Sequence, residues 1–273
     1  MPSDEHQKIV DLLRAIPNDS KLTYPQIRAG LDVRSKTLPP AEGVVIEPTT
    51  INGIDAAWFT PNQVDTEMIL YYLHGGGYCI GSYQSHQSLI SILADSLNCK
   101  CLAINYRLAP ENPFPAAVQD ASAAYEWLIT SISSPTKIVF GGDSAGGGLA
   151  LAAMHDLKMR GVPLPAAAFC ISPWCDLACS GESYQSKIEE DPMLKLDRIV
   201  DMAGVYVGKA NKRSPIINPL NGNFSDFPPL LIHAGTAELL LDDSVALEKK
   251  AKSQGVEVEL EIWNEMFHAF HYY

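Results

Sequence analysis

The stretch of this sequence that most limits the possible folds is "KIVFGGDSAGGGLALAAM", residues 137–154. An apolar, β-branched run typical of a buried strand leads into a run of small residues typical of a helix packed on a sheet. Between the two stands Gly142-Asp143-Ser144-Ala145-Gly146, a G-x-S-x-G pattern in which a serine occupies a strained turn from strand to helix. A phosphate-binding loop is disfavoured because the stretch has no Walker lysine and Asp143 would repel phosphate. The pattern therefore predicts that Ser144 is a nucleophile.

The rest of the chain alternates between strand-like and helix-like patterns. Two strand-like runs come first and flank Asn52-Gly53, a dipeptide typical of a hairpin turn. The further strands are expected at about 68–74, 100–106, 137–142, 166–172, 229–235 and 256–263, and helices at about 85–98, 116–132, 147–160, 196–207 and 243–253. This order predicts an α/β fold with a mostly parallel sheet covered on both faces, whose ligands gather at the carboxyl ends of the strands.

Composition excludes several classes of protein. The chain has 273 residues, enough for one large domain, and its 47% hydrophobic and 19% charged residues are those of an ordinary globular protein. A formal net charge of −12 disfavours nucleic-acid and anionic-membrane partners. The first 20 residues lack a basic segment followed by an apolar one, so a cytoplasmic protein without a membrane anchor is expected. The six cysteines form no C-x-x-C pair, which favours buried free thiols over a metal site.

A second glycine-rich loop, His74-Gly75-Gly76-Gly77, follows the strand-like run at 68–74. Enzymes that transfer acyl groups need backbone N–H groups directed at a developing oxyanion, and glycines let the peptide groups turn toward it. We expect His74 to orient this loop and not to take part in the chemistry.

Three blocks, "HGGG", "NYRLAPENPFPAAVQDA" and "GDSAGG", occur in this order and spacing. From about Val44 to Phe270 the chain resembles the hormone-sensitive-lipase-like branch of the α/β-hydrolases, the bacterial family IV esterases. The resemblance implies a sheet of about eight strands and a helical cap built from about residues 1–43 and about 178–212. It also implies ester hydrolysis without a cofactor, and an oxyanion hole formed by Gly75 and Gly76 with the amide of Ala145.

A nucleophilic serine needs a histidine base and an acid that orients it, and in this fold they follow in the order serine, acid, histidine. Only His268 and His271 come after both Ser144 and the candidate acids. His268 is the better candidate because it follows the last strand by a short loop, at the place of the family's H-x-F element.

Three carboxylates compete for the role of the acid. Glu238 lies in the loop after the strand at 229–235, whereas Asp242 and Asp243 precede a helix and are expected to cap its first amides. We therefore assign Glu238, although the family usually has aspartate there, and keep Asp242 in reserve.

These assignments predict a serine carboxylesterase that acts on short-chain acyl esters, a class that the resemblance implies. Met193, Leu196, Met202 and Val205 could line an acyl pocket, but packing of their own short helix in the core is the simpler explanation. Two alternatives stay open, a ligand-binding receptor of the same fold and an amidase or carbamate hydrolase. The receptor is disfavoured because such proteins characteristically lose the histidine. The last strand, if exposed, could pair two copies edge to edge.

Overall fold

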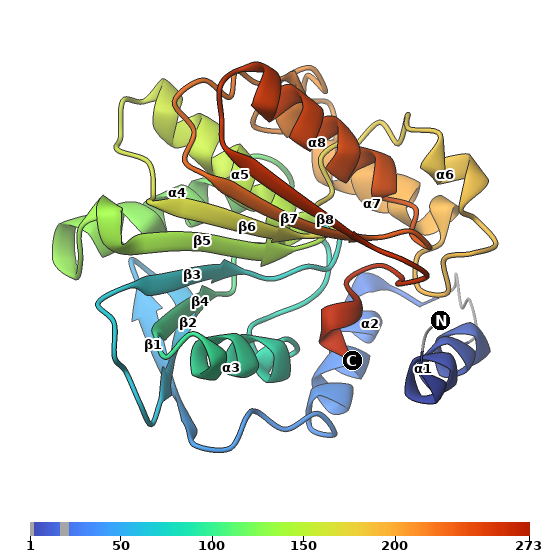
Figure 1. Ribbon diagram of the computed structural model, residues 1–273, viewed down its shortest axis with the longest axis horizontal. Helices are drawn as coiled ribbons and strands as arrows, with labels where there is room; N and C mark the ends of the chain where they lie inside the picture. The colour runs from blue at the N-terminus through green and yellow to red at the C-terminus, as the bar shows by residue number, and fades with distance from the viewer. Residues whose placement is uncertain (1–2, 17–21) are drawn as a thin grey trace.

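The computed structural model describes residues 3–16 and 22–273 of the chain. A single eight-stranded sheet forms its centre, with the strand order β1-β2-β4-β3-β5-β6-β7-β8 (Figure 1). The strands are β1 (Val44–Ile51), β2 (Ile54–Pro61), β3 (Ile69–Leu73), β4 (Lys100–Ile104), β5 (Ile138–Asp143), β6 (Ala167–Ile171), β7 (Leu230–Gly235) and β8 (Val258–Trp263). The strands from β3 onward are parallel, while β1 and β2 are antiparallel neighbours at one edge. The predicted α/β fold is confirmed.

Helices cover both faces of the sheet, as parallel strands require. The helices are α1 (Asp4–Ala15), α2 (Tyr24–Ser35), α3 (Gln87–Ser96), α4 (Ala116–Ser131), α5 (Ala145–Met159), α6 (Ser183–Ser186), α7 (Leu196–Val207) and α8 (Leu241–Ser253). Figure 1 shows α3 on one face of the sheet and α4, α5 and α8 on the other. No helix in the described part of the chain is long and apolar enough to cross a membrane.

The hairpin predicted at Asn52-Gly53 joins β1 to β2. Ile51 pairs with Ile54, and Asn52 and Gly53 have φ angles of 51° and 85°. Both residues are therefore left-handed, as a two-residue turn of this kind needs.

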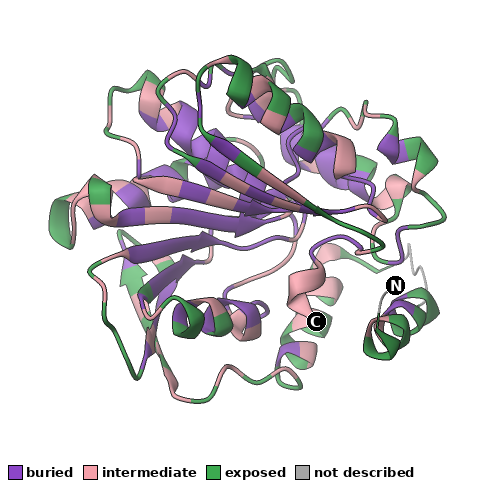
Figure 2. Ribbon diagram, viewed as in Figure 1, coloured by how far each residue is buried: buried purple, intermediate pink, exposed green. Residues whose placement is uncertain are grey.

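The main core lies between the sheet and the helices α4 and α5. The central strands carry side chains that are buried on both faces, and β3 is buried along its whole length (Figure 2). All six cysteines are free and five of them are buried, which confirms the prediction of buried thiols.

The N-terminal helices lie beyond the carboxyl ends of the central strands, together with α6 and α7 (Figure 1). The sequence predicts that the helical segments of this region are broken at four prolines, Pro17, Pro25, Pro39 and Pro40. Pro25 instead stands at the start of α2, where its fixed φ angle suits the first turn, and Pro39 and Pro40 follow the end of that helix. Pro17 lies outside the described residues.

Candidate active site

Ser144 occupies the turn between β5 and α5, with φ 54° and ψ −123°. This conformation is strained for a residue with a side chain, so the surroundings must hold it. The amide of Ser144 donates to the carbonyl of Ile171 at 2.8 Å, and its carbonyl accepts from the amide of Trp174 at 2.9 Å. Gly146 has to be glycine because a Cβ there would collide with the carbonyl of Leu73 on β3. The turn is thus fixed to the strands on both sides of β5.

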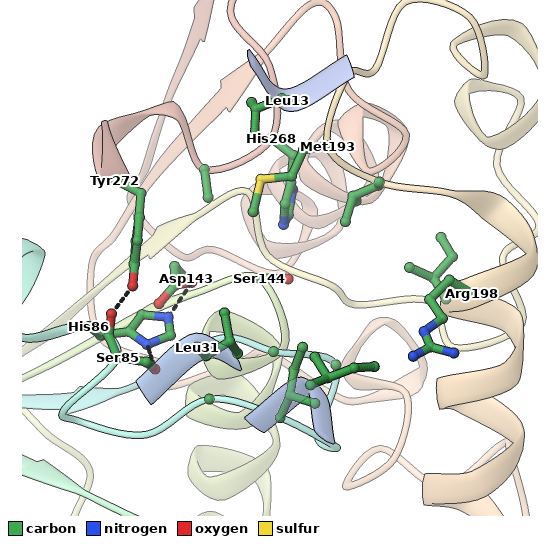
Figure 3. Close-up of a pocket in the computed structure, with 18 of the residues that line it drawn as sticks. Leu13, Leu31, Ser85, His86, Asp143, Ser144, Met193, Arg198, His268 and Tyr272 are labelled. Carbon is green, nitrogen blue, oxygen red and sulfur yellow. Dashed lines mark hydrogen bonds and ion pairs between the residues drawn. The ribbon is translucent and has the colours of Figure 1, made fainter. Parts of the chain in front are cut away.

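Ser144 lies on the wall of a pocket of about 420 Å³ (Figure 3). Apolar side chains make up most of the lining and come from the N-terminal helices and from the segment that contains α7. These side chains include Leu13, Ile16, Leu22, Ile27, Leu31, Leu38, Leu194, Ile199 and Met202. Of the four apolar residues considered for an acyl pocket, Met193 and Met202 line it, whereas Leu196 and Val205 pack against the core.

The loop after β3 brings two of its three glycines to the pocket. Gly76 and Gly77 line it beside Ser144, and their φ angles of 115° and 60° need glycine. Gly75 does not line the pocket, and its amide donates to Asp143 Oδ1 at 3.0 Å. The prediction that Gly75 belongs to the oxyanion hole is therefore wrong, because its only N–H already donates to Asp143 at the end of β5. In the described part of the chain the amides of Gly76, Gly77 and Ala145 have no hydrogen-bond partner.

His268 and Glu238 lie together below the surface of the protein. Glu238 is fully buried, and its Oε2 atom is 3.4 Å from His268 Nδ1, slightly longer than an ordinary hydrogen bond. Figure 3 shows the imidazole of His268 directed toward Ser144 across the pocket. Burial lowers the pKa of His268, but the close contact with the Glu238 carboxylate and its negative charge, together with the charges of Asp191 and Asp143, outweigh burial and raise that pKa above its ordinary value.

The two aspartates that follow Glu238 do not cap their own helix. Both lie in the first turn of α8, but Asp242 Oδ2 accepts from the amide of Ser183 at 2.9 Å. Asp243 Oδ2 accepts from the amides of Cys175 and Asp176 at 2.7 and 2.8 Å. The capping prediction is corrected: these side chains point away from the axis of α8 and bind the loop after β6 and the start of α6. Neither side chain lines the pocket.

The remaining candidate histidines have structural positions. His74 is buried, its ring stacks on Tyr106 at 4.3 Å between centroids, and burial lowers its pKa to about 3. Its Nδ1 lies 2.7 Å from the carbonyl of Gly75. His271 faces His233 at 3.0 Å on β7 and does not line the pocket.

Sequence reasoning missed the role of Asp143 as the anchor of the glycine loop. Besides the amide of Gly75, its carboxylate accepts a hydrogen bond from Tyr72 at 2.8 Å and lies 3.4 Å from His86 (Figure 3). Burial raises the pKa of Asp143, but His86 and Tyr72 outweigh burial and lower it to about 2. An acidic residue inside an apolar strand-to-helix turn was the available signal, because a buried carboxylate needs partners.

A second missed residue, Arg28, ties α2 to the same loop. Its guanidinium donates to the carbonyls of Cys79 and Ala109 at 2.8 and 2.7 Å and forms an ion pair with Glu111. The amide of Cys79 in turn donates to the carbonyl of Gly76. Nothing in the local pattern of α2 indicates these contacts, since they join segments about 50 to 80 residues apart.

Comparison with known proteins places this arrangement in a family. Residues 70–272 match a family model described as the alpha/beta hydrolase fold. An acetyl-hydrolase of Streptomyces hygroscopicus is 44% identical over 236 residues, which cover 86% of this chain and 77% of that protein. An esterase of Acinetobacter venetianus is 28% identical, covering 93% of this chain and 84% of its own length.

Solved structures agree with these relatives. The crystal structure of an esterase/lipase from an uncultured bacterium superimposes with a TM-score of 0.94 at 38% identity, covering 99% of this chain and 92% of that one. An esterase from the bacterial hormone-sensitive lipase family gives a TM-score of 0.95 at 38% identity, covering 100% of this chain and 92% of that one.

The chain therefore belongs to the α/β-hydrolase family and is a serine carboxylesterase. Within that family it is a member of the hormone-sensitive-lipase-like branch, the family IV esterases.

Proposed function

We propose that this enzyme hydrolyses short-chain acyl esters through the triad Ser144, His268 and Glu238. One observation carries the proposal: a strained serine and a histidine share one apolar pocket, and the far side of that histidine meets a buried carboxylate at 3.4 Å. Together these three residues provide a nucleophile, a base and an acid that orients the base, which is the arrangement that catalyses acyl transfer.

In the first half of the reaction His268 takes the hydroxyl proton of Ser144 while the oxygen attacks the ester carbonyl. The tetrahedral oxyanion accepts hydrogen bonds from the amides of Gly76, Gly77 and Ala145, the three that border Ser144 with no partner among the described residues. Glu238 stabilises the imidazolium. The carbon–oxygen bond of the ester then breaks, and the alcohol leaves with the proton from His268.

The second half repeats the sequence with water. His268 removes a proton from the water as its oxygen attacks the acyl-enzyme carbonyl, and Ser144 leaves with that proton. The products are the free acid and the original enzyme, so proton and electron counts balance without a further reactant.

The lining of the pocket supports the substrate class. A volume of about 420 Å³ enclosed mostly by aliphatic side chains suits an uncharged acyl chain of limited length. Two similar proteins support the same substrate class. The Streptomyces hygroscopicus protein is named an acetyl-hydrolase, and crystals of EstE5, a protein of similar structure, were soaked with p-nitrophenyl butyrate.

A series of p-nitrophenyl esters from acetate to palmitate tests the proposal. We expect kcat/KM to be largest for acyl chains of about two to six carbons and to fall for longer ones that exceed the pocket. Phenylmethanesulfonyl fluoride should label wild-type Ser144 but not the S144A protein, as read by mass spectrometry. Absence of both hydrolysis and labelling would instead support a ligand-binding receptor.

We also propose that about residues 1–43 and about 178–212 act as the cap of this single domain. The support is that side chains from both segments, such as Leu31 and Met202, line the same pocket as Ser144.

A homodimer through β8 is a further proposal. The strand ends the sheet, and Ile262 and Trp263 on it are 45% and 46% exposed. Light scattering with an I262K variant tests the dimer, which should dissociate if β8 forms the interface.

A further inference from the structure

Ser172, the residue that follows β6, connects the acid and the base of the proposed triad. Its hydroxyl donates to Glu238 Oε2 at 2.7 Å and accepts from the amide of Ala269 at 3.0 Å. Ala269 comes directly after His268. A hydroxyl has one proton to donate, so the carboxylate receives that proton and the amide uses a lone pair. One fully buried oxygen atom thus joins the loops that carry Glu238 and His268.

The backbone holds this hydroxyl in place. Ser172 has a φ of 47°, an unfavourable value for a residue with a side chain, and its amide donates to the carbonyl of His233 on β7 at 2.7 Å. A strained residue fixed at the end of a buried strand is a rigid support for a functional group.

The position of the Glu238 carboxylate depends strongly on the hydrogen bond from Ser172, because few other groups hold this side chain. Its Oε1 atom has no hydrogen-bond partner among the described residues, and Oε2 contacts only Ser172 and His268. The next amide along the loop, that of Leu239, is used by Asp191 at 2.9 Å. Glutamate also has one more rotatable bond than the aspartate usual in this family, so more side-chain freedom must be lost to hold it in place.

We propose that Ser172 is a positioning residue of the triad: its hydroxyl fixes the Glu238 carboxylate and the loop of His268 relative to each other. The proposal rests on the triad proposed above. Ser172 does not line the pocket, so it acts through Glu238 and not on the substrate.

The test is the S172A protein, assayed with p-nitrophenyl butyrate. We expect kcat to fall about 10- to 100-fold, the range for losing a hydrogen bond to a charged group, with KM changed less than about twofold. The pH midpoint of kcat/KM should move down, because a displaced Glu238 raises the pKa of His268 less. Equal kcat and an unchanged pH midpoint would overturn the proposal.

Two further variants separate positioning from folding. S172G also removes the hydroxyl but relieves the unfavourable φ, so it should lose as much kcat as S172A without losing thermal stability. S244A is the matched control, because Ser244 is fully buried and its hydroxyl has no partner among the described residues. A loss of kcat in S244A as large as in S172A would overturn the proposal.

A double-mutant cycle with E238Q completes the test. If Ser172 acts through the acid, adding S172A to E238Q should lower kcat by less than about threefold more. The same 10- to 100-fold loss in both backgrounds would mean that Ser172 acts elsewhere. Full activity of E238Q would refute the proposed triad itself. An inactive E238Q beside a fully active S172A would refute only the proposed role of Ser172.

Discussion

The two sides of the pocket are held in different ways. On the side of the nucleophile, the buried carboxylate of Asp143 accepts from Tyr72 and Gly75 and meets His86, and Arg28 ties the same loop to α2. On the side of the acid and base, the carboxylate of Glu238 accepts one hydrogen bond from the described chain, that of Ser172. Amides that stabilise a developing charge must be fixed before the reaction, whereas the base has to exchange protons with two partners. The comparison predicts which substitutions change stability and which change only rate.

Replacing Ser144, the proposed nucleophile, should give the largest effect. S144A is expected to lower kcat by about 10⁴-fold or more, since the residual rate comes only from the oxyanion hole and substrate binding. S144G should be equally inactive but more stable than S144A, because glycine adopts the φ of 54° without strain. Thermal unfolding of the two proteins measures this difference. Turnover by S144A at the wild-type rate would exclude the covalent mechanism.

Removing the charge of the acid comes next. E238Q should lower kcat about 10³- to 10⁴-fold with little change in unfolding temperature, because the amide fills the same space but does not stabilise the imidazolium. D242N is the matched control and should keep kcat within about twofold, as Asp242 binds the amide of Ser183 outside the pocket. An inactive D242N beside an active E238Q would show that the acid was assigned to the wrong residue.

Asp143 tests the opposite side, where rate and stability should change together. Tyr72 and the amide of Gly75 both donate to Asp143 Oδ1, whereas Oδ2 faces His86 at 3.4 Å. In D143N either the oxygen beside His86 or the shared acceptor is replaced by an NH₂ group, and leaving a buried donor unpaired costs about 1–3 kcal/mol. We expect kcat to fall about tenfold as the glycine loop shifts. The wild-type carboxyl has a pKa near 2, below its ordinary value, so its contribution to stability is present above about pH 4 and lost as the pH falls toward 2. The free energy of unfolding, measured with denaturant at several pH values in this range, should depend less steeply on pH in D143N than in the wild type.

The smallest expected effect is a shift in the pH profile. His268 must be neutral to accept a proton, so kcat/KM should rise with pH through a midpoint above about 6.5, because Glu238 raises the pKa of the imidazole. In E238Q, measured at high enzyme concentration, this midpoint should fall by at least about half a unit. The contact and charge of Glu238 are then lost, burial still lowers the pKa of His268, and only the smaller effects of Asp191 and Asp143 still raise it. Identical midpoints in the two proteins would contradict the contact between His268 and Glu238.

Most of the fold followed from local patterns. The alternation of strands and helices, the turn at Asn52-Gly53 and the limits of the helix at 196–207 all agree with the structure. The helix after Ser144 begins at Ala145, two residues earlier than predicted, because the turn itself provides the first helical residue. The glycines that follow allow close packing: a Cβ at Gly146 would collide with the carbonyl of Leu73 on β3, and one at Gly148 with the carbonyl of Trp174.

The site was less predictable wherever a role depends on contacts between distant segments. Gly75 and Gly77 are indistinguishable in the sequence, and only the hydrogen bond to Asp143 shows which amide is occupied. Ser172 is one polar residue after an apolar strand, and its two partners lie 66 and 97 residues away. A polar residue at the carboxyl end of a central strand was the signal for it. The cytoplasmic location and the β8 dimer stay predictions.

Arg28 has a consequence for protein engineering. It belongs to the N-terminal helices that shape the pocket, but its guanidinium holds the carbonyl of Cys79 in the turn that presents Gly76 and Gly77. If Gly76 and Gly77 form the oxyanion hole as proposed, a change in the N-terminal helices that alters substrate preference will also alter the position of these amides. Grafting the N-terminal segment of a relative onto this sheet would transfer a new specificity only if the graft brings a cation to the position of Arg28, and a chimera without one should bind esters yet turn them over slowly.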